Sequence, residues 1–213
     1  MFHFLVSQAK TPPYPTQDCT GKTIIVTGAN VGLGLEAARH FVRLGAAKVI
    51  LGCRDVEKGE VARADIEATA TATTAAAAAA TSTAGAGVEA TTTTTTTTTT
   101  IEVWQVDLAS FASVKEFCRR ADGLERLDAV VENAGIAPAE HAEFEGYERT
   151  ITVNVISTFL MALLMLPVLR KSAVGHGIVP NLVIVSSDAH FGVSLSPLLV
   201  ILLLLLVYKM LTV

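Results

Sequence analysis

The sequence has few of the residues from which metal sites and disulfide frameworks are built. It has three cysteines in 213 residues, and none stands in a CxxC pair. This argues against a disulfide framework and against a zinc site, and it is typical of a reducing compartment. Positive charge is not in excess either, because 16 Lys and Arg face 20 Asp and Glu, which leaves a net charge of −4. A nucleic-acid partner is therefore not expected.

A secretory signal is also missing. The N-terminus has no basic start, only a short apolar run and no small-residue cleavage site. Residues 1–20 are predicted to form an extended arm, because prolines stand at 12, 13 and 15. We expect a protein of the cytoplasmic side of the cell that is not secreted.

Large apolar side chains are almost absent from residues 68–100. This segment alternates Ala and Thr, with six alanines at 75–80 and ten threonines at 91–100. It cannot bury enough apolar surface to offset the entropy lost on ordering. We expect a disordered, low-complexity surface insertion.

In the rest of the chain, short apolar runs alternate with amphipathic stretches. The strands are predicted at 23–26, 48–51, 101–107, 127–133 and 181–187, and the helices at 33–44, 56–68, 110–121 and 147–169. Such alternation predicts an α/β fold with a doubly wound parallel sheet, covered on both faces. The domain would span residues 21–192 and would be incomplete at its C-terminal side.

The turn after the first predicted strand reads TGANVGLG, with three glycines in eight residues. In a doubly wound sheet this turn faces the ligand crevice, and the next helix offers free N–H groups and a positive dipole end to phosphates. We expect Gly28 to make the turn, Gly32 to allow close approach and Gly34 to let helix and strand touch. The loop predicts a dinucleotide site.

Four further landmarks stand at or after later strand ends. They are Asp107-Leu108, Asn133-Ala134-Gly135, Asn154 and Ser186-Ser187. With the T-G-x-x-x-G-x-G loop they make the chain resemble the short-chain dehydrogenase/reductase family over residues 11–191, and GCRDVEKGE at 52–60 resembles its fungal retinol-dehydrogenase-like branch. The resemblance implies a Rossmann-type fold and an NAD(P)-binding domain.

The resemblance also implies a set of cofactor-binding residues. They are Thr27, Gly28, Asn30, Val31, Gly32, Leu33, Gly34, Arg54, Asp107, Leu108, Asn133, Ala134 and Gly135. Cys53 stands at the position where a carboxylate would favour NAD(H), and Arg54 follows it. A guanidinium binds phosphate through paired hydrogen bonds, so NADP(H) is predicted. The alternative is a solvated Arg54 paired with Asp55 or Glu57.

Two landmarks carry alternatives of their own. The resemblance makes Asp107 an acceptor for the adenine amino group, and the alternative is an acid that stabilises a helix N-terminus. The family has Asn-Asn-Ala-Gly where this chain has Glu132 before Asn133. A glutamate at this strand end is expected to be tolerated if it faces water.

The resemblance implies hydride transfer between nicotinamide and an alcohol/carbonyl pair. Asn154 matches the family's proton-relay asparagine, and Ser187 matches the serine that orients the substrate oxygen. The family also needs Tyr-x-x-x-Lys after this serine, but Tyr208 is followed at the fourth position by Thr212. We therefore expect an NADP(H)-dependent oxidoreductase whose activity is doubtful because the chain is truncated before that motif. The alternative is an inactive nucleotide-binding or membrane-attached remnant.

The last segment, 193–213, is strongly apolar, with ten apolar residues in a row at 198–207. Three interpretations stay open: an apolar C-terminal helix that anchors the chain in a membrane, a buried helix that covers the sheet, or the product of an abnormal reading frame. The expected partners are the dinucleotide, a lipophilic alcohol/carbonyl substrate and a membrane contacted through 193–213.

Overall fold

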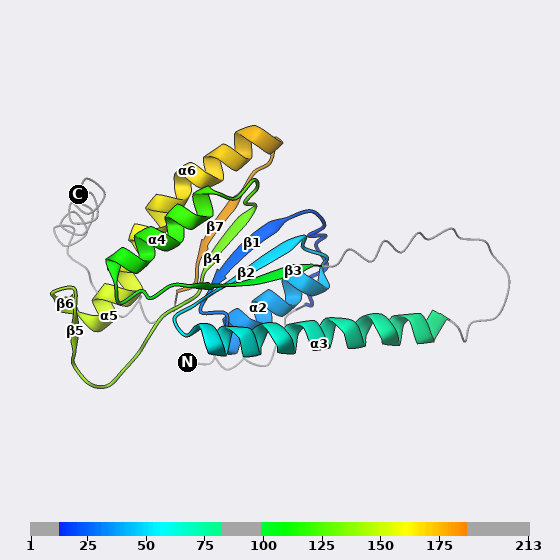
Figure 1. Cartoon of the computed structure of the whole chain (residues 1–213), viewed down its shortest axis with the longest axis horizontal. Helices are drawn as coiled ribbons and strands as arrows, with labels where there is room; N and C mark the ends of the chain where they lie inside the picture. Colours follow the sequence, from blue (N-terminus) through cyan, green and yellow to red (C-terminus); the bar gives the residue numbers. More distant parts are fainter. Residues whose placement is uncertain (1–12, 82–98, 187–213) are drawn as a thin grey trace, which may run out of the picture.

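A parallel sheet of five strands forms the centre of the molecule. The computed structural model describes residues 13–81 and 99–186, with side chains described outside 72–81. The strands follow the order β3-β2-β1-β4-β7, and every neighbouring pair is parallel (Figure 1). They are β1 (Thr23–Thr27), β2 (Lys48–Cys53), β3 (Thr100–Gln105), β4 (Ala129–Glu132) and β7 (Asn181–Ile184). The predicted doubly wound sheet is confirmed.

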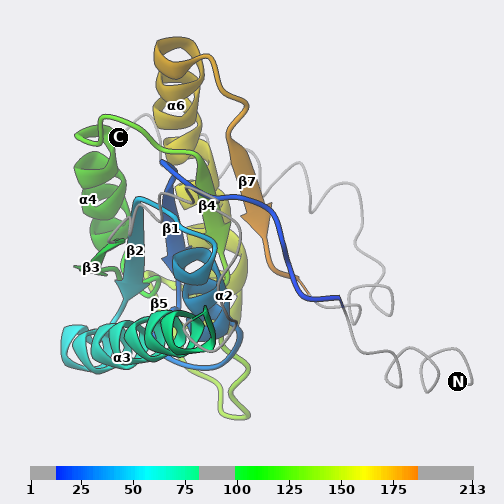
Figure 2. The same ribbon diagram turned by 90° about the vertical axis from the view of Figure 1, so that its right-hand side faces the viewer.

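Helices cover both faces of this sheet (Figures 1 and 2). One core lies between the sheet and the pair α2 (Gly32–Arg43) and α3 (Val56–Thr81). The other lies under α4 (Phe111–Asp122) and α6 (Thr158–His176). Because both faces are covered, β1 is buried along its whole length, which explains why its sequence is a nearly continuous apolar run.

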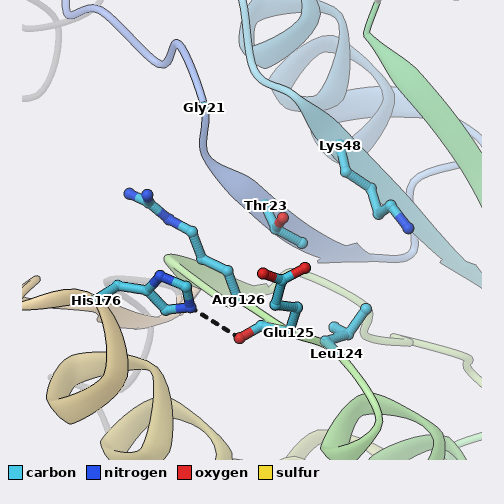
Figure 3. A pocket seen from close by; sticks show the side chains of 7 residues that line it. All are labelled: Gly21, Thr23, Lys48, Leu124, Glu125, Arg126 and His176. Carbon is cyan, nitrogen blue, oxygen red and sulfur yellow. Dashed lines mark hydrogen bonds between the residues drawn. The ribbon is translucent and has the colours of Figure 1, made fainter.

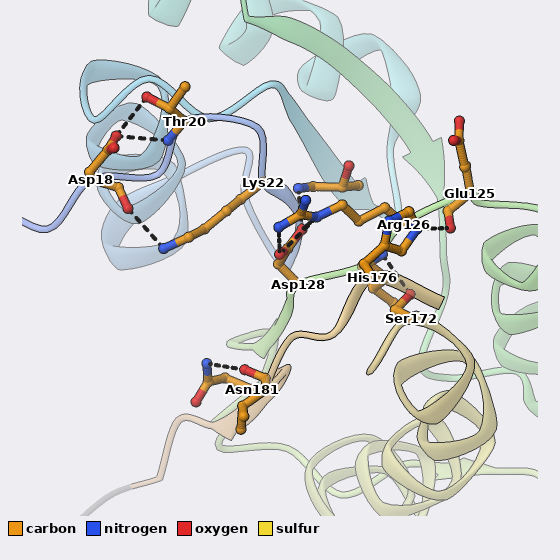
Figure 4. Close-up of polar contacts among 12 residues, drawn as sticks. Asp18, Thr20, Lys22, Glu125, Arg126, Asp128, Ser172, His176 and Asn181 are labelled. Carbon is orange, nitrogen blue, oxygen red and sulfur yellow. Dashed lines mark hydrogen bonds and ion pairs between the residues drawn. The ribbon is translucent and has the colours of Figure 1, made fainter. Parts of the chain in front are cut away.

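The amino ends of the strands are held by a polar network (Figure 4). Asp128 accepts hydrogen bonds from the Thr23 amide at 2.9 Å and from Arg126 Nε at 2.8 Å. Before β1, Asp18 Oδ1 accepts from the Thr20 amide, and Lys22 Nζ donates to the Asp18 carbonyl. These contacts fix the start of β1 against β4 and leave the carboxyl edge open for a site.

The helix predicted over 147–169 is wrong at its N-terminal end. Residues 143–148 form a small antiparallel hairpin, β5 (Glu143–Phe144) and β6 (Tyr147–Glu148). Its turn has positive φ at Glu145 (53°) and Gly146 (80°). The helical stretch then comprises α5 (Arg149–Ile151), the π-helix η1 (Thr152–Ser157) and α6, which continues to His176. A period-based prediction could not separate these pieces, since β6, α5 and η1 are only two, three and six residues long.

The boundary predicted for α3 is also corrected. The helix continues through residues 68–81, so the expected disorder does not hold for that part of the Ala/Thr tract. Alanine has the highest intrinsic helix propensity, and the alanines extend a helix that has already begun at Val56. The remainder of the insertion, 82–98, lies outside the described residues.

One described stretch, Arg149–His176, is long and apolar enough to cross a membrane, and its most apolar 18-residue window has a mean hydropathy of 2.1. This is weak evidence, because 56% of its most apolar window is buried inside the molecule, as in the core helix of a soluble protein. The segment 193–213, for which a membrane anchor or a covering helix was expected, lies outside the described residues.

Candidate functional site

The glycine loop lies where β1 ends, next to the place where the strand order reverses between β1 and β4. Gly28 has a φ of +65°, and a Cβ at this position would lie 2.9 Å from the Ala134 Cα. A Cβ on Gly34 would overlap the Gly28 carbonyl oxygen and the side-chain nitrogen of Asn133. Gly28 and Gly34 are therefore required by close packing, whereas Gly32 has a φ of +63° and open space around it.

The first turn of α2 begins without a side-chain cap. Val31 is its N-cap residue, in an extended conformation, and makes no capping hydrogen bond. Valine is among the poorest residues at this position, because it offers no acceptor to the free amides. Val31 and Leu33 are 67% and 76% exposed, although both are apolar. An anion seated on these amides would supply the missing acceptor.

A clasp joins the end of β4 to the glycine loop. Thr27 Oγ1 accepts hydrogen bonds from the amides of Asn133 and Ala134, both at 3.1 Å. The side-chain nitrogen of Asn133 donates to the carbonyls of Thr27 at 3.1 Å and Gly28 at 3.4 Å. Thr27 is 1% exposed, so its side chain supports the loop from below.

The end of β2 presents one free cation. Arg54 is exposed and forms no ion pair among the residues that the structure describes. Asp55 is occupied elsewhere: its Oδ1 accepts from the Lys58 amide at 3.1 Å, and its Oδ2 lies 3.6 Å from Lys58 Nζ. The Lys58 amide, more than its charge, holds the pKa of Asp55 below its usual range. Burial raises the pKa of the Cys53 thiol to about 11, so Cys53 is uncharged at neutral pH. Among the described residues, Arg54 is therefore the unpaired charged group at this strand end.

Asp107 lies after β3, in the turn that leads to α4. Its Oδ1 accepts from the Ala109 amide at 2.9 Å, and its own amide donates to Ser113 Oγ at 2.9 Å. Ser110 is the N-cap of α4, and its side chain accepts a hydrogen bond from the Ser113 amide. Asp107 thus stabilises the turn with one oxygen, and Leu108 beside it is buried.

Asn154 lies in η1 and clamps the segment that follows β4. Its Oδ1 accepts from the Ile136 amide at 2.8 Å, and its Nδ2 donates to the Ile136 carbonyl at 2.7 Å. A Cβ on Gly135 would lie 3.2 Å from the same Oδ1. Isolated π-helical turns occur often at functional sites, and this one directs Asn154 at the strand end.

Known proteins share this arrangement and much of the sequence. Residues 68–193, more than half of the chain, match the family model for short chain dehydrogenase. The chain belongs to this family. It is 44% identical to the short chain dehydrogenase/reductase dmxR8 of Cryptosporiopsis sp. (strain 8999), over 88% of this chain and 51% of that protein. It is also 44% identical to the short chain dehydrogenase atnD of Emericella nidulans, over 88% of this chain and 52% of that protein.

Solved structures give the same result for the fold. The chain is similar to Pseudomonas aeruginosa RhlG in an NADP active-site complex, with a TM-score of 0.56 and 25% identity, over 83% of this chain and 57% of that chain. The chain spans about half the length of the fungal relatives that it matches. The activity, substrates and partners of the complete short-chain dehydrogenases are therefore only proposals for this chain.

The carboxyl edge brings together most of the residues that the sequence predicted for this short-chain dehydrogenase site. They come from the glycine loop, from the ends of β2, β3 and β4, and from η1. Ser187, the predicted substrate serine, lies outside the described residues, as does Tyr208. Within the described parts of the chain, no three His, Cys, Asp or Glu side chains are grouped so that they could hold a metal ion.

Glu132 does not face water, so the condition under which a glutamate was expected to be tolerated here is not met. Its side chain is 4% exposed, and neither carboxylate oxygen has a hydrogen-bond partner among the described residues. Burial raises its pKa to about 8. Val130 and Glu132 are two positions apart and both are buried, because alternate residues of a strand face the same side of the sheet. The one indication in the sequence that this position is unusual was a glutamate where the family has asparagine.

A hollow of this short-chain dehydrogenase lies at the opposite edge of the sheet (Figure 3). It has a volume of about 380 Å³ and is lined by Lys48, Arg126 and His176 among others. Each of these groups already has a partner: Lys48 pairs with a glutamate of β3, Arg126 pairs with Asp128, and the His176 ring contacts the Glu125 carbonyl at 2.9 Å. The hollow is therefore separate from the candidate site.

Proposed function

We propose that this chain binds NADP(H) at the carboxyl edge of its sheet and belongs to an oxidoreductase that acts on an alcohol/carbonyl pair. The observation that carries the proposal is the uncapped first turn of α2, packed over a glycine cradle. A diphosphate would accept hydrogen bonds from the free amides and would be stabilised by the helix dipole. The residues present fit such a group because Gly32 leaves open space above the loop.

Arg54 supports NADP(H) over NAD(H). The expected alternative, a pair with Asp55, is disfavoured because Asp55 caps α3 and pairs with Lys58. A guanidinium at this strand end would bind the 2′-phosphate of the adenine ribose. RhlG, which was solved with NADP, is a related structure and agrees with this assignment. Asp107 would use Oδ2 for the adenine amino group, since Oδ1 accepts from Ala109.

The chemistry that the dinucleotide supplies is hydride transfer at the nicotinamide. Asn154 would hold the segment after β4 that supports the proton path, through its two hydrogen bonds to Ile136. Ser187 would orient the substrate oxygen and stabilise its developing charge. The residues after Ser187 contain no Tyr-x-x-x-Lys. We therefore propose little or no turnover by this 213-residue polypeptide, and we keep an inactive, nucleotide-binding or membrane-attached remnant as the second candidate.

A binding titration with NADPH and NADH tests the cofactor assignment. The variant Arg54→Asp should weaken NADPH binding at least tenfold, because a hydrogen bond between charged groups contributes about 1.5–3 kcal/mol. Binding of NADH should be unchanged or improved. Arg170→Asp, an exposed arginine on α6, is the matched control. An unchanged ratio of the two affinities in Arg54→Asp would reject the role of Arg54.

Oxidation of NADPH with a panel of lipophilic aldehydes tests turnover by the purified polypeptide. We expect binding without oxidation. Turnover that disappears in Ser187→Ala would overturn the proposal of an inactive polypeptide and would support the complete enzyme activity. Failure to bind either dinucleotide would overturn the binding proposal itself.

A further inference from the structure

The strongest unexplained feature of the structure is the buried carboxyl group of Glu132. It is the last residue of β4, in register with Ile184 of β7. Its side chain is 4% exposed, and both oxygens lack hydrogen-bond partners in the described parts of the chain. A buried carboxylate without a partner is strongly disfavoured, whereas the protonated acid is tolerated at a lower cost.

Glu132 is directly connected to the glycine loop through the next two residues. The amides of Asn133 and Ala134 both donate to Thr27 Oγ1, and the Asn133 side chain holds the carbonyls of Thr27 and Gly28. Gly28 has no room for a Cβ against Ala134. Because this packing is so close, the end of β4 cannot shift without moving the loop.

No cation faces Glu132 from the described elements packed around it. The strands β1 and β7 and the π-helix η1 contain no charged residue. The charged side chains of α4 and α6 are exposed. Among the described residues, the Cys118 thiol of α4 interacts electrostatically with Glu132. Burial, with a smaller contribution from the charge of Glu132, raises the pKa of that thiol to about 12. Nothing among the described residues therefore compensates a negative charge on Glu132.

We propose that Glu132 is a positioning residue for the glycine loop, and that the loop keeps its binding geometry only while the Glu132 carboxyl is protonated. Loss of the proton would force the end of β4 to open toward water, and the clasp on Thr27 and Gly28 would open with it. The consequence for affinity rests on the proposed function, since it assumes that the loop binds a dinucleotide.

Burial raises the pKa of Glu132 to about 8, which places the transition in an accessible range. If only the protonated form binds, apparent affinity scales with its fraction. That fraction is about nine tenths at pH 7 and about one eleventh at pH 9, from the value of about 8. NADPH binding to the wild type should therefore weaken roughly tenfold from pH 7 to pH 9.

The matched variants are Glu132→Gln, which is neutral at every pH, and Glu143→Gln, an exposed glutamate of β5. Glu132→Gln should bind NADPH with an affinity that changes by less than threefold over the same range, whereas Glu143→Gln should follow the wild type. Glu132→Asn serves as a second neutral variant if Glu132→Gln does not fold. Equal pH dependence in the wild type and in the neutral variant would overturn the proposal.

A second measurement separates this proposal from the cofactor assignment, because it needs no ligand. In ¹⁵N NMR spectra of the free chain, the amide signals of Asn133 and Ala134, which donate to Thr27 Oγ1, should titrate together with a midpoint near pH 8, in the upfield direction of lengthened hydrogen bonds. They should not titrate in Glu132→Gln. Static signals in the wild type would overturn the positioning role. If the signals titrate but no NADPH binds at either pH, the positioning role stands and the proposed function fails.

Discussion

Glu132 should make the stability of this protein fall as pH rises through the neutral range. Burial raises the pKa of its carboxyl from an ordinary value of 4.5 to about 8. The folded protein then keeps this proton up to about pH 8, while the unfolded chain loses it near pH 4.5. Between these values the folded state binds more protons, so the free energy of unfolding decreases with pH.

The size of the effect follows from the two pKa values. Each unit of difference corresponds to 1.36 kcal/mol, so the full shift corresponds to about 5 kcal/mol. Between pH 5 and pH 8 the expected loss is about 3 to 4 kcal/mol, because the transitions are partly complete at both limits. A typical domain has a total stability of about 5–15 kcal/mol, so the loss is large enough to measure.

Urea unfolding followed by the fluorescence of Trp104, which is 3% exposed, measures this difference. The wild type and Glu132→Gln are compared from pH 5 to pH 8.5. All other titratable groups are common to both proteins, so the difference between the two curves reports Glu132 alone. We expect the advantage of the glutamine variant to grow by about 3 kcal/mol with rising pH at constant m-value. A difference constant to within about 0.5 kcal/mol would refute the reasoning, since Glu132 would then be ionised and solvated in the folded protein.

Three further predictions concern the same framework. Gly34→Ala should destabilise the protein by about 1–3 kcal/mol and abolish NADPH binding, because its Cβ has no room, whereas Gly175→Ala, in open space, should do neither in thermal unfolding and titration assays. Asp128→Asn should lower the free energy of unfolding in urea by about 2 kcal/mol or more, because it weakens the hydrogen bonds of this buried carboxylate to Arg126 and to the Thr23 amide at the start of β1. The control Asp122→Asn, at an exposed position, should leave the stability unchanged. Ser110→Ala should cost about 1 kcal/mol as the lost N-cap of α4, and an unchanged unfolding midpoint would contradict that role.

The glycine loop illustrates what could be predicted of the site from sequence. Three glycines between an apolar run and an amphipathic stretch place a bare backbone turn after a strand, and Gly28 and Gly34 are indeed packed too closely for side chains. Asp107, Asn133 and Asn154 were predicted from the resemblance to the family. Asp107 and Asn133 share one edge because parallel strands end on the same side, whereas η1 carries Asn154 to it. The role of each in binding stays a prediction.

The roles of the polar side chains could not be predicted in the same way. The side-chain amide of Asn154 forms two hydrogen bonds with the backbone of Ile136. The hydroxyl of Thr27 accepts hydrogen bonds from two amides more than 100 positions away in the sequence. Residue type limits what such a group can bond, but only the folded chain brings the partner within reach. The hairpin of β5 and β6 was missed for a related reason, because its two-residue strands are too short to show a period.

The sequence by itself determined the five strands of the parallel sheet, the alternation of those strands with helices, and the edge at which a ligand would bind, because apolar periodicity and glycine positions are local properties of the chain. Only the tertiary structure decided that Glu132 is buried without a partner among the described residues, that Thr27 accepts hydrogen bonds from the end of β4, and that Asn154 bonds to Ile136. The physical reason is that exposure and pairing are set by the neighbours that folding brings together, and those neighbours are distant in sequence.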